Sequence, residues 1–566
     1  MALTDKVRDL PGRIQKGWET QRGRVRSRPV VLKPYSGHPI PLVRRIAVWS
    51  ILPIIVFFCL PYGFFYALYT PYLIVMFAAP VAIVMALTIW ALPDMKTYPA
   101  RSLVVLYFAY LASLILWPNY LAIALPGLPW ITLLRLFGFP MTLALLICIS
   151  VSPVFRTEMM ETLKPTPLIW KGVVLFVLLQ LISIPFSHKP VDSVSKFLVV
   201  QVDWIAIFFV SCYVFRRPGR PEAWAYMVWA MAIVIGAIGL REYSNEQVLW
   251  AGHIPSFLKI NDETVNRILE GSRRDATGQY RIASTATTSL GLAEYTSLCL
   301  PFVLHFISWG RTRLVRLAAL ASVPMLLLVI IETDARLGMV GFFMSVLIYL
   351  LFWSLRLWRE RKDSLVGAAI VLAYPVVFTM MVASTFFVGR IRNKIWGGGQ
   401  YNDSNAGRMA QVNSGLPMIA THPLGHGVGM GGEVLGYKNP AGTGTIDSYY
   451  LLIGLEYGLL GFLVYFGVFL IAIWLSSRVA IFAKLAHRDY AILVPTSVAL
   501  INFFVIKSIF SNDDNHPLAF MMLGLVVAVL ARMKKDPAVQ AAAAPAAVPA
   551  RAGVPRRVAI AAGRAG

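Results

Sequence analysis

Uncharged apolar runs long enough to cross a bilayer recur along almost the whole chain. The longest, residues 46–93, holds 48 residues without Asp, Glu, Lys or Arg, which is enough for two helical spans. The 566-residue chain is 57% hydrophobic and 14% charged, whereas soluble globular proteins average about 45–50% and about 25%. A membrane β-barrel would instead alternate apolar and polar residues over strands of about 10 residues. We therefore predict an all-α polytopic integral membrane protein with about 14 transmembrane helices (about 12 to 14).

The basic residues orient these helices. Besides the two spans in residues 46–93, we expect spans near 102–124, 136–155, 172–187, 197–215, 223–240, 290–309, 317–333, 337–355, 365–385, 449–474, 490–511 and 515–531. A cytoplasmic N-terminus places most of the 52 Lys and Arg residues on the cytoplasmic side, as the positive-inside rule requires. The net charge of +24 therefore reflects topology, and we expect no nucleic-acid partner.

The chain divides by composition into four parts. We expect a basic cytoplasmic N-terminal segment (1–45), N-terminal transmembrane helices (46–170), a transmembrane core (171–535) and a disordered, Ala/Pro-rich cytoplasmic tail (536–566). The four cysteines lie inside apolar runs without the spacing of a zinc or redox site, so they are expected to pack as small hydrophobes.

Two external loops, 241–290 and 386–447, are too long to be simple connectors, and both carry arginines on the face where the positive-inside rule predicts few. For Arg267, Arg273 and Arg274 we favour ordinary solvated ion pairs with the loop acids Asp262, Glu263, Glu270, Asp275 and Asp403. Three other arginines, Arg281, Arg336 and Arg408, stand at the predicted mouths of spans, where a charge is costly unless a partner or ligand satisfies it. Because guanidinium groups match phosphate and carboxylate oxygens, these three are candidates for an anion site.

The second loop continues into a glycine-rich run from Thr421 to Glu433 and then into Asp447. The run lacks the Gly-Lys-Ser/Thr ending of a nucleotide loop. His422 and His426 are four residues apart, but Pro423 and the glycines favour an irregular loop over a helical metal-binding pair. Asp447 stands at the entrance to a span, either as a functional carboxylate or only as a helix N-cap.

Two other polar groups have competing interpretations. The turn from Asn512 to His516 contains oxygen ligands that suit Mg²⁺ or Ca²⁺, although an ordinary polar turn is favoured. Asp203 lies with Gln201 inside an apolar span, so it is either functional or buried against another helix.

Three motifs follow one another along the chain: Ser404-x3-Arg408, His422-Pro423-Leu424-Gly425-x-Gly427-x-Gly429, and Asp447-Ser448-x-Tyr450-Leu451-x4-Glu456-x-Gly458-x2-Gly461. This ordered set resembles the C-terminal signature of the O-antigen ligase and Wzy-type polysaccharide polymerase superfamily. The segments 281–293 and 333–336 look like the other two Arg-bearing segments of that superfamily. The resemblance covers about residues 170 to 530.

The resemblance implies a membrane glycosyltransferase of the class C (GT-C) type, with a large periplasmic loop containing short helices, that acts on glycans carried by polyprenyl pyrophosphate. In this interpretation Arg281, Arg336 and Arg408 bind the pyrophosphate, and Asp447 is the first candidate for the general base, followed by His426 and His422. The expected reaction is an inverting transfer without a cofactor or a metal. We expect a bacterial inner-membrane protein with both termini in the cytoplasm.

Three functions remain in competition. Ligases of the superfamily commonly have His-Asn where this chain has Asp447-Ser448, which favours a polymerase that joins lipid-linked repeat units to an acceptor glycan. The nearest alternative is a ligase that transfers the glycan to lipid A core. A transporter or flippase of lipid-linked oligosaccharide is a third, although no convincing internal repeat supports it. Membrane lipids are expected partners, and docking of a chain-length regulator stays open.

Overall fold

A computed structural model describes residues 83–95, 97–124, 130–260, 262–274, 278–389, 402–438, 444–483 and 488–536, with the single positions 50, 53 and 392. The chain forms two units, Met1–Lys96 and Thr97–Gly566. In the first unit the description covers little more than a helix at 83–91. The predicted basic segment, most of the two spans in 46–93 and the tail after residue 536 lie outside the described residues. All elements named below belong to the second unit.

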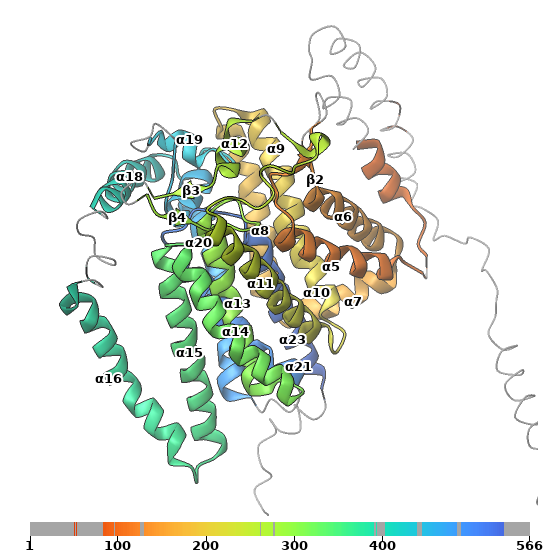
Figure 1. Cartoon of the computed structure of the whole chain (residues 1–566). Helices are drawn as coiled ribbons and strands as arrows, with labels where there is room; N and C mark the ends of the chain where they lie inside the picture. The colour runs from red at the N-terminus through yellow and green to blue at the C-terminus, as the bar shows by residue number, and fades with distance from the viewer. Residues whose placement is uncertain are drawn as a thin grey trace, which may run out of the picture. The chain divides into compact units, whose positions relative to one another are not determined.

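Helices make up most of this unit (Figure 1). The N-terminal half contains α5 (Ala100–Leu116), α6 (Leu133–Val151), α7 (Pro153–Leu163), α8 (Pro167–Ser183), η1 (Ile184–Phe186), α9 (Pro190–Val200), η2 (Gln201–Ala206), α10 (Ile207–Val214) and α11 (Arg220–Asn245). The C-terminal half contains α13 (Ser289–Trp309), α14 (Arg313–Glu332), α15 (Arg336–Glu360), α16 (Leu365–Phe387), α20 (Tyr449–Phe482), α21 (Arg488–Ala491), α22 (Leu493–Ile506) and α23 (His516–Lys535). The prediction of an all-α polytopic membrane protein is confirmed.

Among the described residues, eleven helices are long and apolar enough to span a membrane. They correspond to eleven of the twelve spans expected after residue 100. The twelfth, expected over 102–124, is the shorter helix α5, which ends at Leu116. Its C-cap residue Trp117 is extended and precedes Pro118, and the residue before a proline disfavours the helical conformation.

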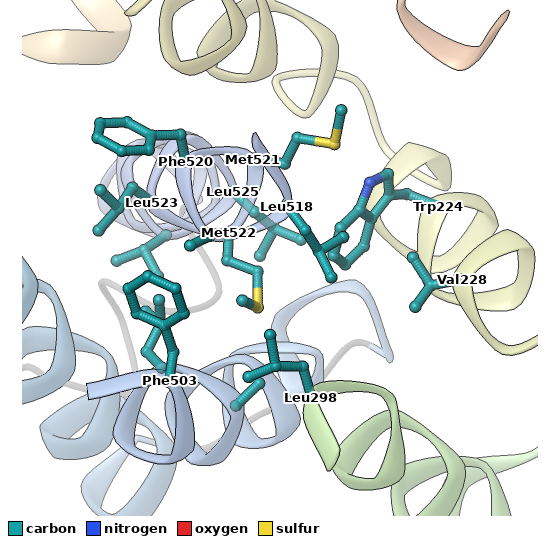
Figure 2. Close-up of a cluster of buried hydrophobic side chains, with 14 of the residues drawn as sticks. Trp224, Val228, Leu298, Phe503, Leu518, Phe520, Met521, Met522, Leu523 and Leu525 are labelled. Carbon is teal, nitrogen blue, oxygen red and sulfur yellow. The ribbon is translucent and has the colours of Figure 1, made fainter. Parts of the chain in front are cut away.

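The protein core surrounds α23. Its most apolar 18-residue window is 89% buried, because α10, α20 and α22 pack against it. Figure 2 shows Leu518, Met522 and other side chains of α23 between Phe503 of α22, Leu298 of α13 and Trp224 of α11. By contrast, the corresponding window of α16 is only 6% buried. Within the described part of the protein, α16 packs mainly against α15. An apolar helix exposed in this way suits contact with lipid.

Irregular segments and short elements gather at one end of the unit (Figure 1). The first long loop forms η3 (Ser256–Leu258), α12 (Glu263–Leu269) and the antiparallel strands β3 (Ser272–Arg273) and β4 (Tyr280–Arg281). A second antiparallel pair joins β1 (Ala122–Ile123) to β2 (Ile131–Thr132). The second long loop forms α18 (Asn402–Thr421) and α19 (Gly431–Leu435). Short helices were expected here, and α18, with 20 residues, is longer than that expectation.

Candidate functional site

Asp447 forms an ion pair with Arg408 between α18 and the start of α20. The Nε atom of Arg408 lies 3.4 Å from Oδ2 of Asp447, and both side chains are about one-third exposed. The Asp447 backbone N–H donates to Oε1 of Gln411, one helical turn after Arg408, at 2.9 Å. Burial raises the pKa of the Asp447 carboxyl above its ordinary value, and the Arg408 guanidinium offsets part of that rise. The site therefore holds a carboxylate that takes up a proton more readily than an ordinary aspartate.

The N-cap of α20 is Ser448 and not Asp447. The Ser448 hydroxyl accepts the Leu451 N–H at 3.4 Å and donates to the Ser508 carbonyl at 2.7 Å. A serine at this position satisfies one of the unpaired N–H groups at the helix start. Because the neighbouring residue performs the capping, the interpretation of Asp447 as only an N-cap is wrong.

The turn that carries Asp447 is attached to the segment after α22. The Tyr449 N–H donates to the Lys507 carbonyl at 3.1 Å, and the Ser511 hydroxyl donates to the Ile446 carbonyl. Together with the bond from Ser448 to Ser508, these contacts join residues 446–449 to the segment 507–511. The position of the Asp447 carboxylate therefore depends on the segment 507–511.

A buried ion pair that the sequence analysis missed holds that segment. Lys507 Nζ lies 2.8 Å from Oε1 and 3.0 Å from Oε2 of Glu294 on α13, and both side chains are fully buried. Lys507 also donates to the Asn512 carbonyl, and Asn515 donates to Oε2 of Glu294 at 3.2 Å. A signal existed in the sequence, because both charges fall inside or at the edge of predicted apolar spans, where charge is costly.

Arg281 lies against the turn that precedes α15. Its Nε donates to the Thr333 carbonyl at 3.0 Å, and the next residue, Ile282, donates its N–H to the Glu332 carbonyl. Arg336 is the first residue of α15, so the structure places the two arginines on adjoining segments. Asp334 in this turn has a left-handed backbone and pairs with Arg274.

The start of α15 is a second feature of this turn. Its N-cap, Ala335, provides no side-chain hydrogen bond to the helix, and the first N–H groups of a helix attract anions. Ala335 packs with Ala293 of α13 and with Ile506 and Phe510, which flank Lys507. The segment 506–511 therefore contacts the Arg336 turn on one side and the Asp447 turn on the other. Arg408 pairs with Asp447, whereas Arg281 and Arg336 lie on the adjoining segments of the other turn.

The two histidines lie in an irregular loop packed on a break in α20. The helix is interrupted at Gly458, where φ is 67° and ψ is −174°, a conformation open essentially to glycine alone. His426 donates both its backbone N–H, at 3.0 Å, and its ring Nδ1, at 2.9 Å, to the Leu455 carbonyl. Gly427 donates to the Glu456 carbonyl at 3.1 Å. The irregular loop expected from the sequence is confirmed.

This arrangement separates the roles of the histidines. His426 is 5% exposed, and its ring is fixed by the helix backbone, whereas His422 is exposed and bonds Thr421. The ring centroids lie 4.5 Å apart. The Glu456 carboxylate accepts the N–H groups of Gly429 and Gly431, which ties the glycine run to the same break. His426 therefore anchors the loop, and His422 is the more accessible of the two.

Replacing Gly458 by Ala is expected to destabilise this loop. A Cβ atom there would lie 1.8 Å from the Pro423 carbonyl oxygen, in addition to a backbone strain of about 1–3 kcal/mol. Gly467→Ala on the same helix is the matched control, because its Cβ would meet no atom within 4 Å. Thermal unfolding of the purified protein in detergent should show a lower midpoint for Gly458→Ala alone. Equal midpoints for the two variants would contradict the packing described here.

The remaining polar residues make local contacts. Arg273 pairs with Glu246 at the surface, 2.9 Å apart, and Arg274 pairs with Asp334. Both were expected to form ion pairs, but neither Glu246 nor Asp334 is among the acids expected as partners. In the turn after α22, Asp514 accepts hydrogen bonds from Thr287 and Asn512. No group of three or more His, Cys, Asp or Glu side chains in the described part of the chain is arranged to hold a metal ion.

Comparison with known families identifies the region that carries most of these residues. Residues 320–466 match the family model Wzy_C, described as O-antigen ligase. The matched region includes Arg336, Arg408, Asp447 and both histidines, whereas Arg281 and the pair of Lys507 and Glu294 lie outside it. A comparison with curated proteins gave no match. The resemblance to the O-antigen ligase and Wzy-type superfamily is confirmed for this region, and it supports a ligase-type or polymerase-type function in a multi-pass membrane protein.

Proposed function

We propose, on the premise that residues 320–466 belong to the O-antigen ligase family, that the chain is a polysaccharide polymerase. It joins repeat units carried on polyprenyl pyrophosphate at the periplasmic face of the bacterial inner membrane, with both termini in the cytoplasm. The observation that carries the proposal is the Asp447 carboxylate, which caps no helix, pairs with Arg408 and has a raised pKa. A carboxylate of this kind suits removal of a proton from an acceptor hydroxyl.

In the proposed reaction, Asp447 takes the proton of the acceptor hydroxyl. The hydroxyl oxygen then bonds to the anomeric carbon of the donor sugar, the bond from that carbon to the pyrophosphate oxygen breaks, and the anomeric configuration inverts. The leaving group is polyprenyl pyrophosphate, whose added negative charge requires cations or N–H donors. Arg281, Arg336 and the N–H groups at the start of α15 supply them on adjoining segments.

Arg408 takes a different position from the other two arginines. Its pairing with Asp447 supports a role at the junction of base and donor, where it holds the carboxylate and meets the pyrophosphate from the other side. A guanidinium can do both, because its fork of five donors serves more than one partner. We therefore propose that all three arginines bind the pyrophosphate, and that Arg408 also holds the Asp447 carboxylate.

A ligase that transfers the glycan to lipid A core is the second candidate, and the description of the matched family favours it. The polymerase is preferred because Asp447-Ser448 stands where ligases of the family commonly carry His-Asn. His426 does not replace that histidine in a simple way, because its ring is fixed to the backbone of α20.

The size of the glycan on the polyprenyl carrier separates these functions. In membranes of a strain that lacks the protein, we expect single lipid-linked repeat units at the outer face and no polymer. Full-length polymer retained on the carrier would instead identify a ligase, and single units trapped at the inner face would identify a transporter. Complementation with the wild-type chain should restore polymer and serves as the control.

A further inference from the structure

Two acids of the membrane helices take no part in the proposed reaction. Asp203, in the π-helical segment η2, accepts a hydrogen bond from the Tyr110 hydroxyl of α5 at 2.8 Å, so its carboxylate is bonded to another helix. Glu242, in the last turn of α11, is 1% exposed and accepts three hydrogen bonds from the segment that carries Arg281. Glu242 therefore joins a membrane helix to a segment of the proposed donor site.

The Glu242 carboxylate binds the chain both before and after Arg281. Its Oε1 atom accepts the Tyr280 hydroxyl at 2.9 Å and the Ala283 N–H at 3.2 Å, and its Oε2 atom accepts the Ser284 N–H at 2.7 Å. Both oxygens act as acceptors, which is the behaviour of an ionised carboxylate. Glu242 thus fixes the three residues that flank Arg281 and Ile282 in the sequence.

The side chains of this segment alternate in burial. Tyr280 and Ile282 are 2% and 0% exposed, whereas Arg281 between them is partly exposed. Successive side chains of a strand point to opposite faces, so burial of its two neighbours toward α11 turns Arg281 away from that helix. A Cβ atom at Gly239 of α11 would lie 3.2 Å from the Cδ1 atom of Ile282, so the segment packs closely on α11. The orientation of Arg281 therefore depends on the contacts of its neighbours with α11.

Backbone strain occurs in this segment and in the turn that Arg281 contacts. Ser284 and Asp334 have positive φ values of 53° and 48°, which residues other than glycine seldom adopt. Such conformations persist where the surrounding structure imposes them, and they cluster at active sites and ligand-binding sites. Two bonds to α11 hold Ser284, one from its N–H to Glu242 and one from its hydroxyl to the Ile235 carbonyl at 2.8 Å. The strained conformation of Ser284 is therefore maintained by α11.

We propose that Glu242 is a positioning residue of the pyrophosphate site, which orients Arg281 for the donor without contacting the donor itself. The inference rests on the proposed role of Arg281 and adds a residue that lies outside the matched region 320–466. An arginine on a loop binds an anion more strongly when the loop is already ordered, because ordering it on binding reduces the affinity. The three bonds to Glu242 provide that order before the donor binds.

Binding of inorganic pyrophosphate to the purified protein tests the inference. Glu242→Gln keeps the size of the side chain but replaces one accepting oxygen by an NH2 group, so we expect the pyrophosphate Kd to rise about tenfold. Arg281→Gln should raise it by at least as much. If Glu242 acts through Arg281, the double variant should bind within about twofold of Arg281→Gln alone. Factors that multiply in the double variant would overturn the positioning role.

Further variants separate positioning from a general effect on the fold. In an active protein, Glu242→Gln should raise the donor KM about tenfold and leave the acceptor KM within about twofold of wild type. Glu246→Gln, one helical turn later and at the surface, makes the same chemical change and should alter neither value. Tyr280→Phe removes one of the three bonds and keeps the ring. It should raise the pyrophosphate Kd by less than tenfold, and it replaces Glu242→Gln in the test if that variant fails to fold.

The pyrophosphate measurement also distinguishes failure of this inference from failure of the proposed function. Weaker binding in Glu242→Gln, with no further loss in the double variant, supports the positioning role even if no glycan transfer is observed. Wild-type affinity in Glu242→Gln and Tyr280→Phe, together with weak binding in Arg281→Gln, would overturn the inference and leave the proposed donor site standing. Wild-type affinity in Arg281→Gln would remove both.

Discussion

Replacing Asp447 by Asn is expected to lower the rate of glycan polymerisation by about 10²–10⁴-fold. The amide has nearly the same shape as the carboxylate but accepts no proton at neutral pH, so general-base assistance is lost while the turn keeps its hydrogen bonds. The Asp447 backbone bond to Gln411 and the Ser448 cap do not involve the Asp447 carboxylate. The measurement is the initial rate of polymer formation from purified lipid-linked repeat units.

The controls for this prediction concern folding and the choice of base. Asp192→Asn, an exposed acid in the first turn of α9, makes the same chemical change away from the Asp447 turn and should transfer glycan at the wild-type rate. Both variants should insert in the membrane in equal amounts. A wild-type rate in Asp447→Asn would remove the base assignment, and His422→Gln would then be the next variant to measure, since His422 is the more exposed histidine.

The same role predicts how the rate depends on pH. A general base works in its deprotonated form, so the rate falls as the pH decreases through the pKa of Asp447. Because burial raises this pKa, the acid limb of the profile should lie at higher pH than for an ordinary aspartate. Arg408 opposes the rise, so Arg408→Gln should move the limb to still higher pH, in addition to lowering the maximal rate. An unshifted limb in Arg408→Gln would show that another group titrates.

The fold follows from the sequence where a single physical signal decides it. Apolar runs of about 20 residues fix the positions of the spans, because a bilayer offers the backbone no hydrogen-bond partners outside a helix. Among the spans expected after residue 100, α5 falls short of its expected length, because it ends at Leu116 and Trp117 precedes Pro118. This signal was present in the sequence but was outweighed by the apolar residues after it. The break at Gly458 could not be inferred, because it depends on the approach of Pro423 from a separate loop.

The candidate site follows from the sequence only in its individual residues. Arg281, Arg336 and Arg408 could be recognised as charges at span mouths, yet their grouping depends on tertiary contacts. Arg408 meets Asp447 across 39 positions, and Arg281 meets Thr333 across 52. The distinction between Asp447 and Ser448 as the cap depends on which side chain turns toward the helix start. Neighbouring residues with similar capping propensities leave that choice open in a sequence.

Replacing Lys507 by Met is expected to destabilise the protein by about 3–5 kcal/mol. The change leaves the fully buried Glu294 with Asn515 as its remaining side-chain hydrogen-bond partner. Burial of a carboxyl group without its cation destabilises the folded protein, even if the carboxyl takes up a proton. Thermal unfolding in detergent, followed by tryptophan fluorescence, gives the size of the effect. Arg273→Met, which breaks an exposed pair with Glu246, is the control and should cost at most about 1 kcal/mol.

The double variant Lys507→Met with Glu294→Met determines what the pair contributes beyond stability. Two apolar side chains of similar volume remove the unpaired charge, so most of the lost stability should return. The Lys507 carbonyl, which accepts the Tyr449 N–H, is unchanged in all these variants. If the ion pair serves to fix the segment 507–511, the double variant should remain folded but polymerise glycan more slowly than wild type, because the bond from Lys507 to the Asn512 carbonyl is gone. A double variant with wild-type stability and wild-type rate would show that the ion pair is not needed to hold the Asp447 turn.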